Sequence, residues 1–280
     1  MIESVKHFMP VNIIVAHGLE AKALVRMLEL ERHHVSSEFV EYSNSNKLHL
    51  LVSGIGKEAI TAAVTYLGEQ QASDSGEIRA WLNIGIAGHR DASLGNAWLG
   101  NKITDQSSGA SAYPPQLIEG IEVGSVVTVD EPENSYPLDA AYEMEASAFY
   151  AEATKYSTAE LVQVFKVISD NLVNPISEID IRSVPGLIAA QAPQLQILIE
   201  GMSAIATQHN SNQRLPSYFS EVCSKIHLTV NQKLQLRRLC QRYKALGMEE
   251  ELSSAADLRV GDARTLIQQL AERIDRISEA

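Results

Sequence analysis

The chain has 280 residues, of which 45% are hydrophobic, a composition that predicts one large or two ordinary globular domains. No apolar run is long enough to span a bilayer, and the first residues lack the basic and apolar regions of a secretory signal, so we expect a cytoplasmic protein without a membrane segment. The net charge of −12 is uneven: residues 1–210 hold 12 Lys and Arg against 26 Asp and Glu, which argues against a nucleic-acid partner.

The first part of the chain predicts two units of strand, turn and helix. Residues 11–16 read V-N-I-I-V-A, as in a buried strand, and the helix that follows carries Glu20 in its first turn. A second apolar strand at 48–52 runs into Ser53-Gly54-Ile55-Gly56 and another helix. A glutamate at a helix start is most often a solvated residue favoured by the helix dipole, so Glu20 gains functional meaning only together with other residues.

The glycines of the second turn invite a dinucleotide-binding interpretation. Gly54-x-Gly56-x-x-Ala59 formally matches that fingerprint. However, the next predicted strand, 81–84, ends in Gly85 rather than in an acid that could hold a ribose, and Lys57 is not followed by the Ser or Thr of a phosphate-binding loop. The glycines are therefore predicted to permit a tight turn between strand and helix.

A second glycine-rich stretch, Gly85 to Gly88, follows the third strand. Such small residues are equally typical of a plain turn and of a site where a planar base lies against the backbone. His89 and Arg90 are either surface residues of the turn or anion contacts. Residues 97–103 and 126–129 predict further strands, and the irregular stretch 104–125 between them could line the mouth of a site or form a lid.

The stretch from Tyr142 to Asn171 predicts the centre of a site. The triplet Glu143-Met144-Glu145 is predicted to open a helix whose apolar stripe is Ala146, Phe149, Tyr150 and Ala153. Val164 to Ile168 predicts a strand buried on both faces, and Ser169 and Asp170 follow it. Because ligands bind at the carboxyl ends of strands in open α/β sheets, acids from these two elements indicate a polar small-molecule site.

The last part of the chain predicts helices only. The apolar segment 187–206 indicates a helix with a break at Pro193, and the polar stretch 208–216 suggests a boundary between domains 1–208 and 209–280. Cys223 and Cys240 show no spacing typical of a disulfide framework or a metal site. One amphipathic helix is marked by Leu236, Leu239, Cys240, Tyr243 and Leu246, and another, with Asp262 as candidate N-cap, by Ile267, Leu270, Ile274 and Ile277. The basic face of the first, Lys233, Arg237, Arg238 and Arg242, is predicted to be solvated or to dock on the acidic part of the chain.

These motifs, taken in order, resemble a known family. The strand before Glu20, the turn at Ser53 to Gly56, Asn83-x-Gly85-x-Ala87-Gly88, Glu143-Met144-Glu145 and Ile168-Ser169-Asp170 resemble the nucleoside phosphorylase and nucleosidase superfamily, most closely its 5′-methylthioadenosine/S-adenosylhomocysteine nucleosidase branch. The resemblance spans residues 11–205. It implies an α/β fold, a three-layer α/β/α domain with a central mixed sheet, and it implies cleavage of the N-glycosidic bond of a purine nucleoside. The predicted C-terminal helical extension has no counterpart in the family fold.

The resemblance also assigns roles to individual residues. Asp170 would be the general acid that protonates the purine N7, and Glu20 the general base that positions the attacking water. Glu145 would hold the ribose 2′ and 3′ hydroxyls, and Met144 would pack beneath the sugar. The remaining assignments are Ser169, which would orient Asp170, Ala87 and Gly88, which would lie against the base, and Glu143, which belongs to the same substrate-binding motif. This chemistry needs no metal and no cofactor.

Departures from the family pattern keep alternatives open. His89 stands where the nucleosidases usually carry a second glycine, and the segment between Gly100 and Glu143 is shorter than theirs. The Gly-Asp-x-x-Arg phosphate loop of many phosphorylases is absent near Gly18, which favours water as the nucleophile. Arg90 could still bind phosphate, so a phosphorylase with phosphate as co-substrate is the first alternative. The second is a nucleoside-binding protein without turnover. Because family members build active sites near subunit interfaces, we expect a homodimer or a larger homo-oligomer.

Overall fold

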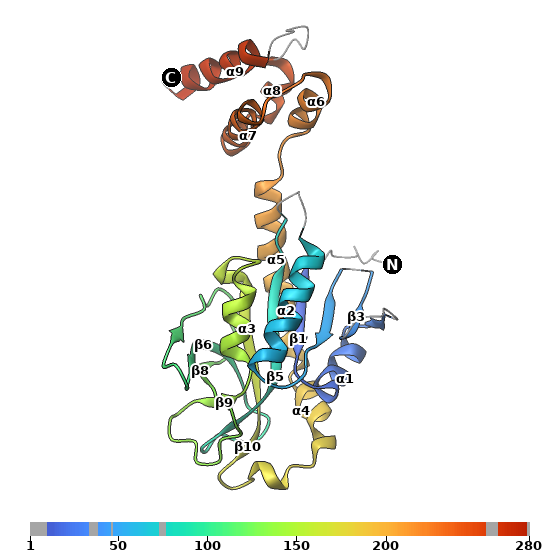
Figure 1. Cartoon of the computed structure of the whole chain (residues 1–280), viewed down its shortest axis with the longest axis vertical. Coiled ribbons are helices and arrows are strands. Elements are labelled where there is room, and N and C mark those ends of the chain that lie inside the picture. The colour runs from blue at the N-terminus through green and yellow to red at the C-terminus, as the bar shows by residue number, and fades with distance from the viewer. Residues whose placement is uncertain (1–9, 34–38, 46, 73–76, 256–262, 279–280) are drawn as a thin grey trace. The chain divides into compact units, whose positions relative to one another are not determined.

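The computed structural model describes residues 10–33, 39–45, 47–72, 77–255 and 263–278 (Figure 1). The chain divides into two compact units, Met1–Asn210 and Ser211–Ala280. The division falls inside helix α5 (Ala192–Gln213), so the polar stretch after residue 208 continues the helix rather than forming a loop at once.

The first unit is built on one mixed sheet of ten strands. Every residue of β1 and β10 is buried, which explains why their sequences are apolar runs rather than alternating patterns. The strands are β1 (Val11–Val15), β2 (Glu31–Arg32), β3 (Val40–Ser43), β4 (His49–Val52), β5 (Ala80–His89), β6 (Ala97–Asp105), β7 (Ser111–Ala112), β8 (Val123–Thr128), β9 (Ala141–Glu143) and β10 (Val162–Asn171).

Helices cover both faces of this sheet, so the predicted three-layer α/β/α architecture is confirmed (Figure 1). Helices α1 (Gly18–Met27), α4 (Val184–Ala190) and α5 share one apolar cluster with the sheet, and α2 (Lys57–Gln71) and α3 (Ala146–Ala153) share another. Three short 3₁₀ turns lie at Ala159–Leu161, Ile176–Glu178 and Ile181–Ser183. Gly54 and Gly56 have φ of +92° and +97°, which confirms that they permit the turn before α2.

The topology brings three distant strands together at Gly88. Strand β5 pairs with β10 in parallel along most of its length, and Gly88 there lies opposite Asp170. On its other side, Gly88 pairs with Tyr142 of β9. A register shift between Ile168 and Asp170 changes the direction of the β10 side chains at this point. Residues far apart in the sequence therefore meet at one end of the sheet.

Three local predictions around this meeting point are wrong. Gly85 to Gly88 do not form a turn, because the strands on both sides extend β5 as far as His89. Ser169 and Asp170 likewise belong to β10 rather than following it. The triplet Glu143-Met144-Glu145 does not lie within a helix: Glu143 ends β9, Glu145 is the N-cap, and α3 begins at Ala146. Ala146, Phe149 and Ala153 are buried, as the predicted apolar stripe requires.

Two further predictions need correction. The chain breaks at Gln191, between α4 and α5, so Pro193 stands in the first turn of α5 instead of at the break. Residues 104–125 include the end of β6, β7 and the start of β8. None of them lines the cavity that lies where β5, β9 and β10 meet. The loop after β8 lines it instead.

The second unit contains the helices α6 (Ser217–Lys225), α7 (Val230–Ala245), α8 (Glu249–Ala255) and α9 (Ala263–Ser278). Its core is formed by Tyr218, Val222, Leu236, Leu239, Cys240, Tyr243, Leu270 and Ile274, among others, which confirms most positions of both amphipathic patterns. Leu246 does not belong to the core, since it is 52% exposed, and the side chain of Ile277 lies outside the described part of the chain. The candidate N-cap Asp262 lies outside the described residues. The basic residues of α7 are exposed: Lys233, Arg237, Arg238 and Arg242.

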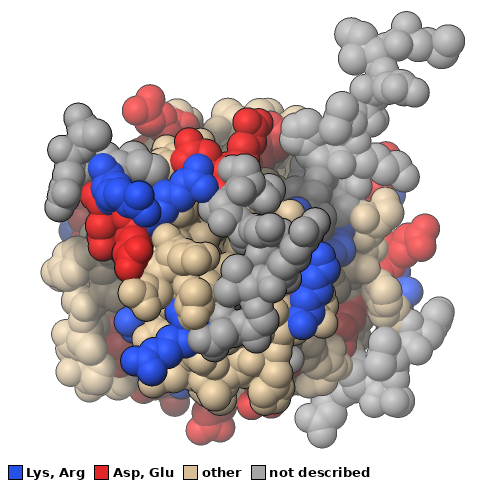
Figure 2. All heavy atoms as spheres, turned by 90° about the horizontal axis from the view of Figure 1, so that it is seen from above, with Lys and Arg blue, Asp and Glu red and all other residues tan. Residues whose placement is uncertain are grey.

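The charges of the surface are mixed. On the face shown in Figure 2, Lys and Arg lie in several separate groups, some of them beside Asp and Glu. In the second unit, Arg242 pairs with Asp275 at 3.3 Å, and Arg237 lies over the ring of Phe219. Among the described helices, none is both long and apolar enough to cross a membrane.

Candidate active site

A cavity of about 300 Å³ opens where β5, β9 and β10 meet. Its wall includes all but one of the residues that the sequence assigned to a site: Glu20, Ala87, Gly88, Glu143, Met144, Glu145, Ser169 and Asp170. The exception is Arg90, which is not part of the lining. The wall also contains apolar side chains from other segments, among them Leu19, Ile55, Ile86, Ile176, Ile181 and Val184. The cavity is thus an apolar pocket with a few acidic groups.

Glu20 is placed by the turn between β1 and α1. The ring of His17 caps the helix, and Glu20 completes a capping box at the third helical position. The carboxylate accepts the N–H groups of Ala16 and His17 on one oxygen, both at 2.9 Å, and that of Ile86 on the other at 3.0 Å. Because Glu20 is 4% exposed, its interpretation as a solvated surface residue is wrong. Three backbone donors hold the carboxylate in one orientation at the cavity wall.

Asp170 is held from two sides. The Ser169 hydroxyl donates to Asp170 Oδ1 at 2.6 Å, and the Tyr136 hydroxyl donates to Oδ2. Asp170 is buried, at 3% exposure. Burial, together with the Asp170 carboxylate, raises the pKa of Tyr136, so the phenol keeps its proton and is the donor. Asp170 therefore faces the cavity in a fixed position.

The carboxylate of Glu143 is bonded to other groups of the protein. It accepts the hydroxyl of Thr128 at 2.6 Å and the backbone N–H of Ala146 at 2.8 Å, and it pairs with Lys166 Nζ at 2.8 Å. These contacts cap the N-terminus of α3 from a residue that precedes the helix. Glu143 touches the cavity, but its hydrogen bonds fix α3 and thereby the neighbouring Glu145.

Glu145 has an unusual electrostatic environment. Burial raises its pKa from 4.5 to about 7, although Lys166 and the N–H of Gly56, at 2.8 Å, act in the opposite direction. The folded protein therefore binds the proton more tightly than the unfolded chain does. The contribution of Glu145 to stability is full below pH 4.5 and is lost as the pH rises through about 7.

Lys166 is a buried partner of the site's acids that the sequence interpretation missed. It lies in β10, and its side chain is only 1% exposed. Burial would lower its pKa, but the carboxylates of Glu143, Glu145 and Glu20 outweigh that effect and raise it. A lysine within the run V-F-K-V-I was the available signal, since lysine is almost never fully buried unless it is paired. The buried ammonium group of Lys166 thus interacts favourably with three carboxylates of the site.

Close packing against Glu20 and Lys166 explains why residue 85 is a glycine. A Cβ at Gly85 would lie 2.9 Å from Glu20 Oε1 and 3.2 Å from Lys166 Nζ. Any side chain at this position would displace one of the two charged groups. Gly85 therefore gives the charged groups room beside the strand, rather than forming a turn.

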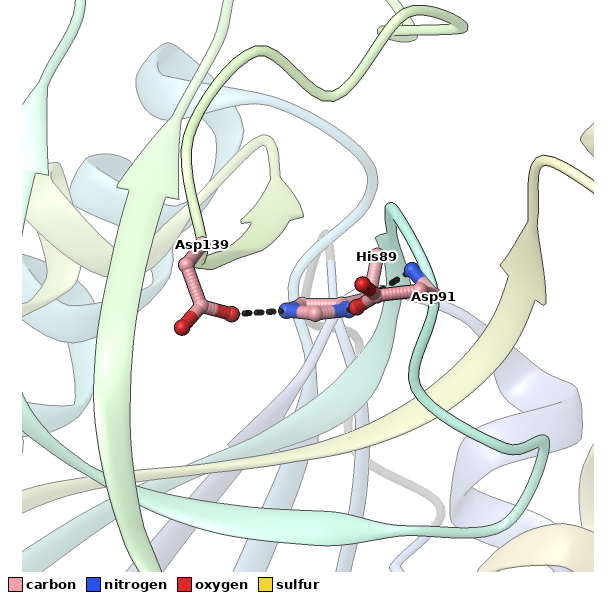
Figure 3. Close-up of side chains that lie close together, drawn as sticks. All are labelled: His89, Asp91 and Asp139. Carbon is pink, nitrogen blue, oxygen red and sulfur yellow. Dashed lines mark hydrogen bonds and ion pairs between the residues drawn. The ribbon is translucent and has the colours of Figure 1, made fainter.

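His89 and Arg90 are not among the residues that line the cavity. His89 Nδ1 accepts the N–H groups of Asp91 and Ala92, so Nε2 carries the ring proton and donates to Asp139 at 3.0 Å (Figure 3). His89, Asp91 and Asp139 form the one group of metal-ligand type found among the described residues, and both ring nitrogens are already used in these hydrogen bonds. Arg90, with its side chain 43% exposed, lies near Asp91.

Comparison with solved structures identifies the fold. The apo form of 5′-methylthioadenosine nucleosidase from Arabidopsis thaliana matches with a TM-score of 0.58 and 15% identity, over 70% of this chain and 96% of that one. Futalosine hydrolase of Helicobacter pylori strain 26695 matches with 0.56 and 14%, over 69% and 98%. A 5′-methylthioadenosine/S-adenosylhomocysteine nucleosidase from Colwellia psychrerythraea, solved with adenine, matches with 0.52 and 20%, over 70% and 97%. No protein-family model matches the chain, and a comparison with curated protein sequences gives no match. The chain has the nucleosidase fold.

Proposed function

We propose that this protein is an enzyme that cleaves the N-glycosidic bond of a purine nucleoside with water, and that its substrate resembles 5′-methylthioadenosine or S-adenosylhomocysteine. The observation that carries the proposal is the meeting of Asp170, Glu145 and Glu20 on one cavity, at the places where the family resemblance assigns them roles. The nucleosidase structures that share the fold support the same class of reaction.

In the proposed reaction two carboxyl groups transfer protons, and a third holds the sugar. Protonated Asp170 gives its proton to N7 of the purine, the C1′–N9 bond breaks, and the bonding electrons leave with the neutral base. Glu145 holds the ribose 2′ and 3′ hydroxyls while positive charge develops at C1′. Glu20 then takes a proton from water as the water oxygen bonds to C1′. Exchange with solvent returns both carboxyl groups to their starting states. No cofactor takes part.

Water is favoured over phosphate by the charge of the cavity. Among the residues that line it, none is Lys or Arg, and five are Asp or Glu: Glu20, Glu133, Glu143, Glu145 and Asp170. A phosphate dianion would be repelled there unless a cation outside the described cavity moved to it. We therefore expect Arg90→Gln to leave the rate of base release within about twofold of wild type. If wild type instead released base only with phosphate, and Arg90→Gln lost this phosphate-dependent release, the reaction would be phosphorolysis.

The proposed function is tested by following base release. Methylthioadenosine, S-adenosylhomocysteine, adenosine and inosine are each incubated with the full chain, with and without phosphate. Release of the base without phosphate is the expected result, and the fastest substrate identifies the 5′ substituent. Binding of a nucleoside without release under either condition would move the assignment to a binding protein.

The raised pKa of Glu145 predicts how nucleoside affinity depends on pH. An ionised carboxylate accepts hydrogen bonds from both ribose hydroxyls, whereas a protonated one must itself donate. We expect the affinity of the Asp170→Asn variant for its nucleoside to rise with pH up to about 7 and then to level off. Calorimetric titrations on both sides of pH 7 measure this affinity. The control is the double variant Asp170→Asn/Glu145→Gln, whose affinity should not change with pH. A profile with the same slope in both variants would refute the role of Glu145.

A further inference from the structure

Tyr136 lies directly against the point where β5, β9 and β10 meet. It is 2% exposed, and its hydroxyl donates to Asp170 Oδ2. A Cβ added at Gly88 would lie 2.6 Å from Tyr136 Cε1 and 2.7 Å from the hydroxyl oxygen. The edge of the ring therefore rests on the backbone of Gly88, and no planar group fits between the two.

The contacts of Tyr136 are those that a purine would need in the proposed reaction. An aromatic ring lies against Gly88, and a hydrogen-bond donor meets the oxygen of Asp170 that a protonated N7 would approach. We infer that the ring of Tyr136 occupies the base-binding position in the free protein, and that a nucleoside binds by displacing it. The inference rests on the proposed function, since that position is defined by Asp170 and Gly88.

The loop that carries Tyr136 is fastened near both ends. It joins β8 to β9, and Asp130 at its start pairs with Lys57. Near its end, Asp139 accepts the hydrogen bond of His89 at 3.0 Å, and the N–H of Leu138 donates to the Tyr142 hydroxyl at 2.8 Å. Because these contacts hold the two ends of the loop, its middle can move while β8 and β9 stay in place.

The backbone at Tyr136 itself is strained. Its φ is +43°, in the left-handed region that costs free energy for residues other than glycine. The ring packs against Tyr142, with the ring centroids 5.7 Å apart, and Met144 adjoins the same cluster. Packing and the bond to Asp170 thus hold a conformation that the backbone alone disfavours, and departure of the ring relieves that strain.

Displacement of Tyr136 makes the site select for a base. When the tyrosine leaves, Asp170 Oδ2 loses its donor, and an occupant must restore a hydrogen bond there, either with an N–H or O–H group or with an acceptor that takes the proton of protonated Asp170, as N7 does in the proposed reaction. A purine can do so. A sugar without a base can bind to Glu145, at the other part of the cavity, without moving Tyr136. Substitutions of Tyr136 should therefore change the affinity for a free base and leave that for a free sugar unaltered.

Calorimetric titration of the full chain with adenine and with ribose tests the inference. Tyr136→Phe keeps the ring but removes the bond to Asp170, and it is expected to bind adenine about tenfold more tightly than wild type. Tyr136→Ala should bind adenine at least as tightly as Tyr136→Phe, and ribose should bind all three proteins equally. Tyr113→Phe, at an exposed tyrosine outside the cavity lining, is the matched control and should bind like wild type.

The outcomes separate the inference from the proposed function. Adenine binding that is unchanged or weakened in Tyr136→Phe would overturn the inference alone, since the tyrosine would then be a fixed wall or a ligand contact. Failure of wild type and all variants to bind adenine would overturn the purine site and the inference with it. Hydrogen exchange gives a second readout that needs no variant. Adenine should speed amide exchange in residues 130–140 of wild type, and slower exchange would contradict displacement.

Discussion

The Asp170→Asn variant is expected to lose turnover by a factor of about 10²–10⁴ and to keep its nucleoside affinity within about tenfold of wild type, because the variant also loses the acceptor of the Tyr136 hydroxyl. An amide has the size and the acceptor oxygen of the carboxylate, so the hydrogen bond from Ser169 can persist. It cannot transfer a proton to N7, and the base would have to leave as an anion. The effect therefore falls on the chemical step rather than on binding.

Single-turnover measurements of base release, with affinity measured in parallel, check this expectation. Asp275→Asn is a matched control, because Asp275 is exposed and belongs to the second unit. Its turnover should equal that of wild type. The role of Asp170 would be refuted by a variant that cleaves at the wild-type rate. Loss of binding and turnover together would assign Asp170 to ligand recognition instead of acid catalysis.

Lys166→Met is expected to lower the free energy of unfolding of the first unit by about 3–5 kcal/mol. The substitution removes the cation that pairs with Glu143 and takes its counter-charge from the buried carboxylates around it. The double variant Glu143→Gln/Lys166→Met should be less destabilised than the sum of the two single variants, because it removes both members of the pair.

Urea denaturation followed by tryptophan fluorescence measures this, since both tryptophans, Trp81 and Trp98, lie in the first unit. Lys155→Met is the control: Lys155 also pairs with a glutamate, Glu152, but its side chain is 64% exposed. That pair should contribute less than about 1 kcal/mol. Equal destabilisation by both substitutions would mean that burial of Lys166 has no special energetic role.

The parts of the fold that depend on local patterns could be predicted from the sequence. Apolar runs identified β1, β4 and β10, and the glycine turn before α2 followed from Gly54 and Gly56, whose positive φ angles only glycine adopts easily. Amphipathic spacing identified α7 and α9. In each case the residues that decide the structure lie within one element.

The errors arise where distant segments decide the structure. Gly85 to Gly88 look like a turn in isolation, and they become a strand because β9 and β10 arrive from more than fifty residues away to pair with them. Glu143 looks like a helix start, yet the pairing of β9 with β8, in which Glu143 lies opposite Thr128, keeps its segment extended up to that residue. Propensity within a short window cannot register such pairing.

The site residues also divide into those that the local sequence indicates and those that only the fold brings together. Acidic residues at strand ends could be placed near one another, and the structure brings Glu20, Glu145 and Asp170 to one cavity. Lys166 was hidden in an apolar strand, because only the fold shows that it meets three carboxylates there. Tyr136 gave no signal at all, since its contact with Asp170 depends on the path of a loop. Arg90 was a candidate for binding an anion, but it lies outside the cavity lining.

The measurement that tests the central claim most directly is the identity of the sugar product formed in phosphate-free water enriched in oxygen-18. The full chain is incubated with its best purine nucleoside, and base and sugar are analysed by mass spectrometry. We predict free purine in equal amount to a sugar that carries one heavy oxygen atom, acquired when water bonds to C1′. Intact nucleoside after prolonged incubation, or a sugar phosphate formed only when phosphate is added, would contradict hydrolysis.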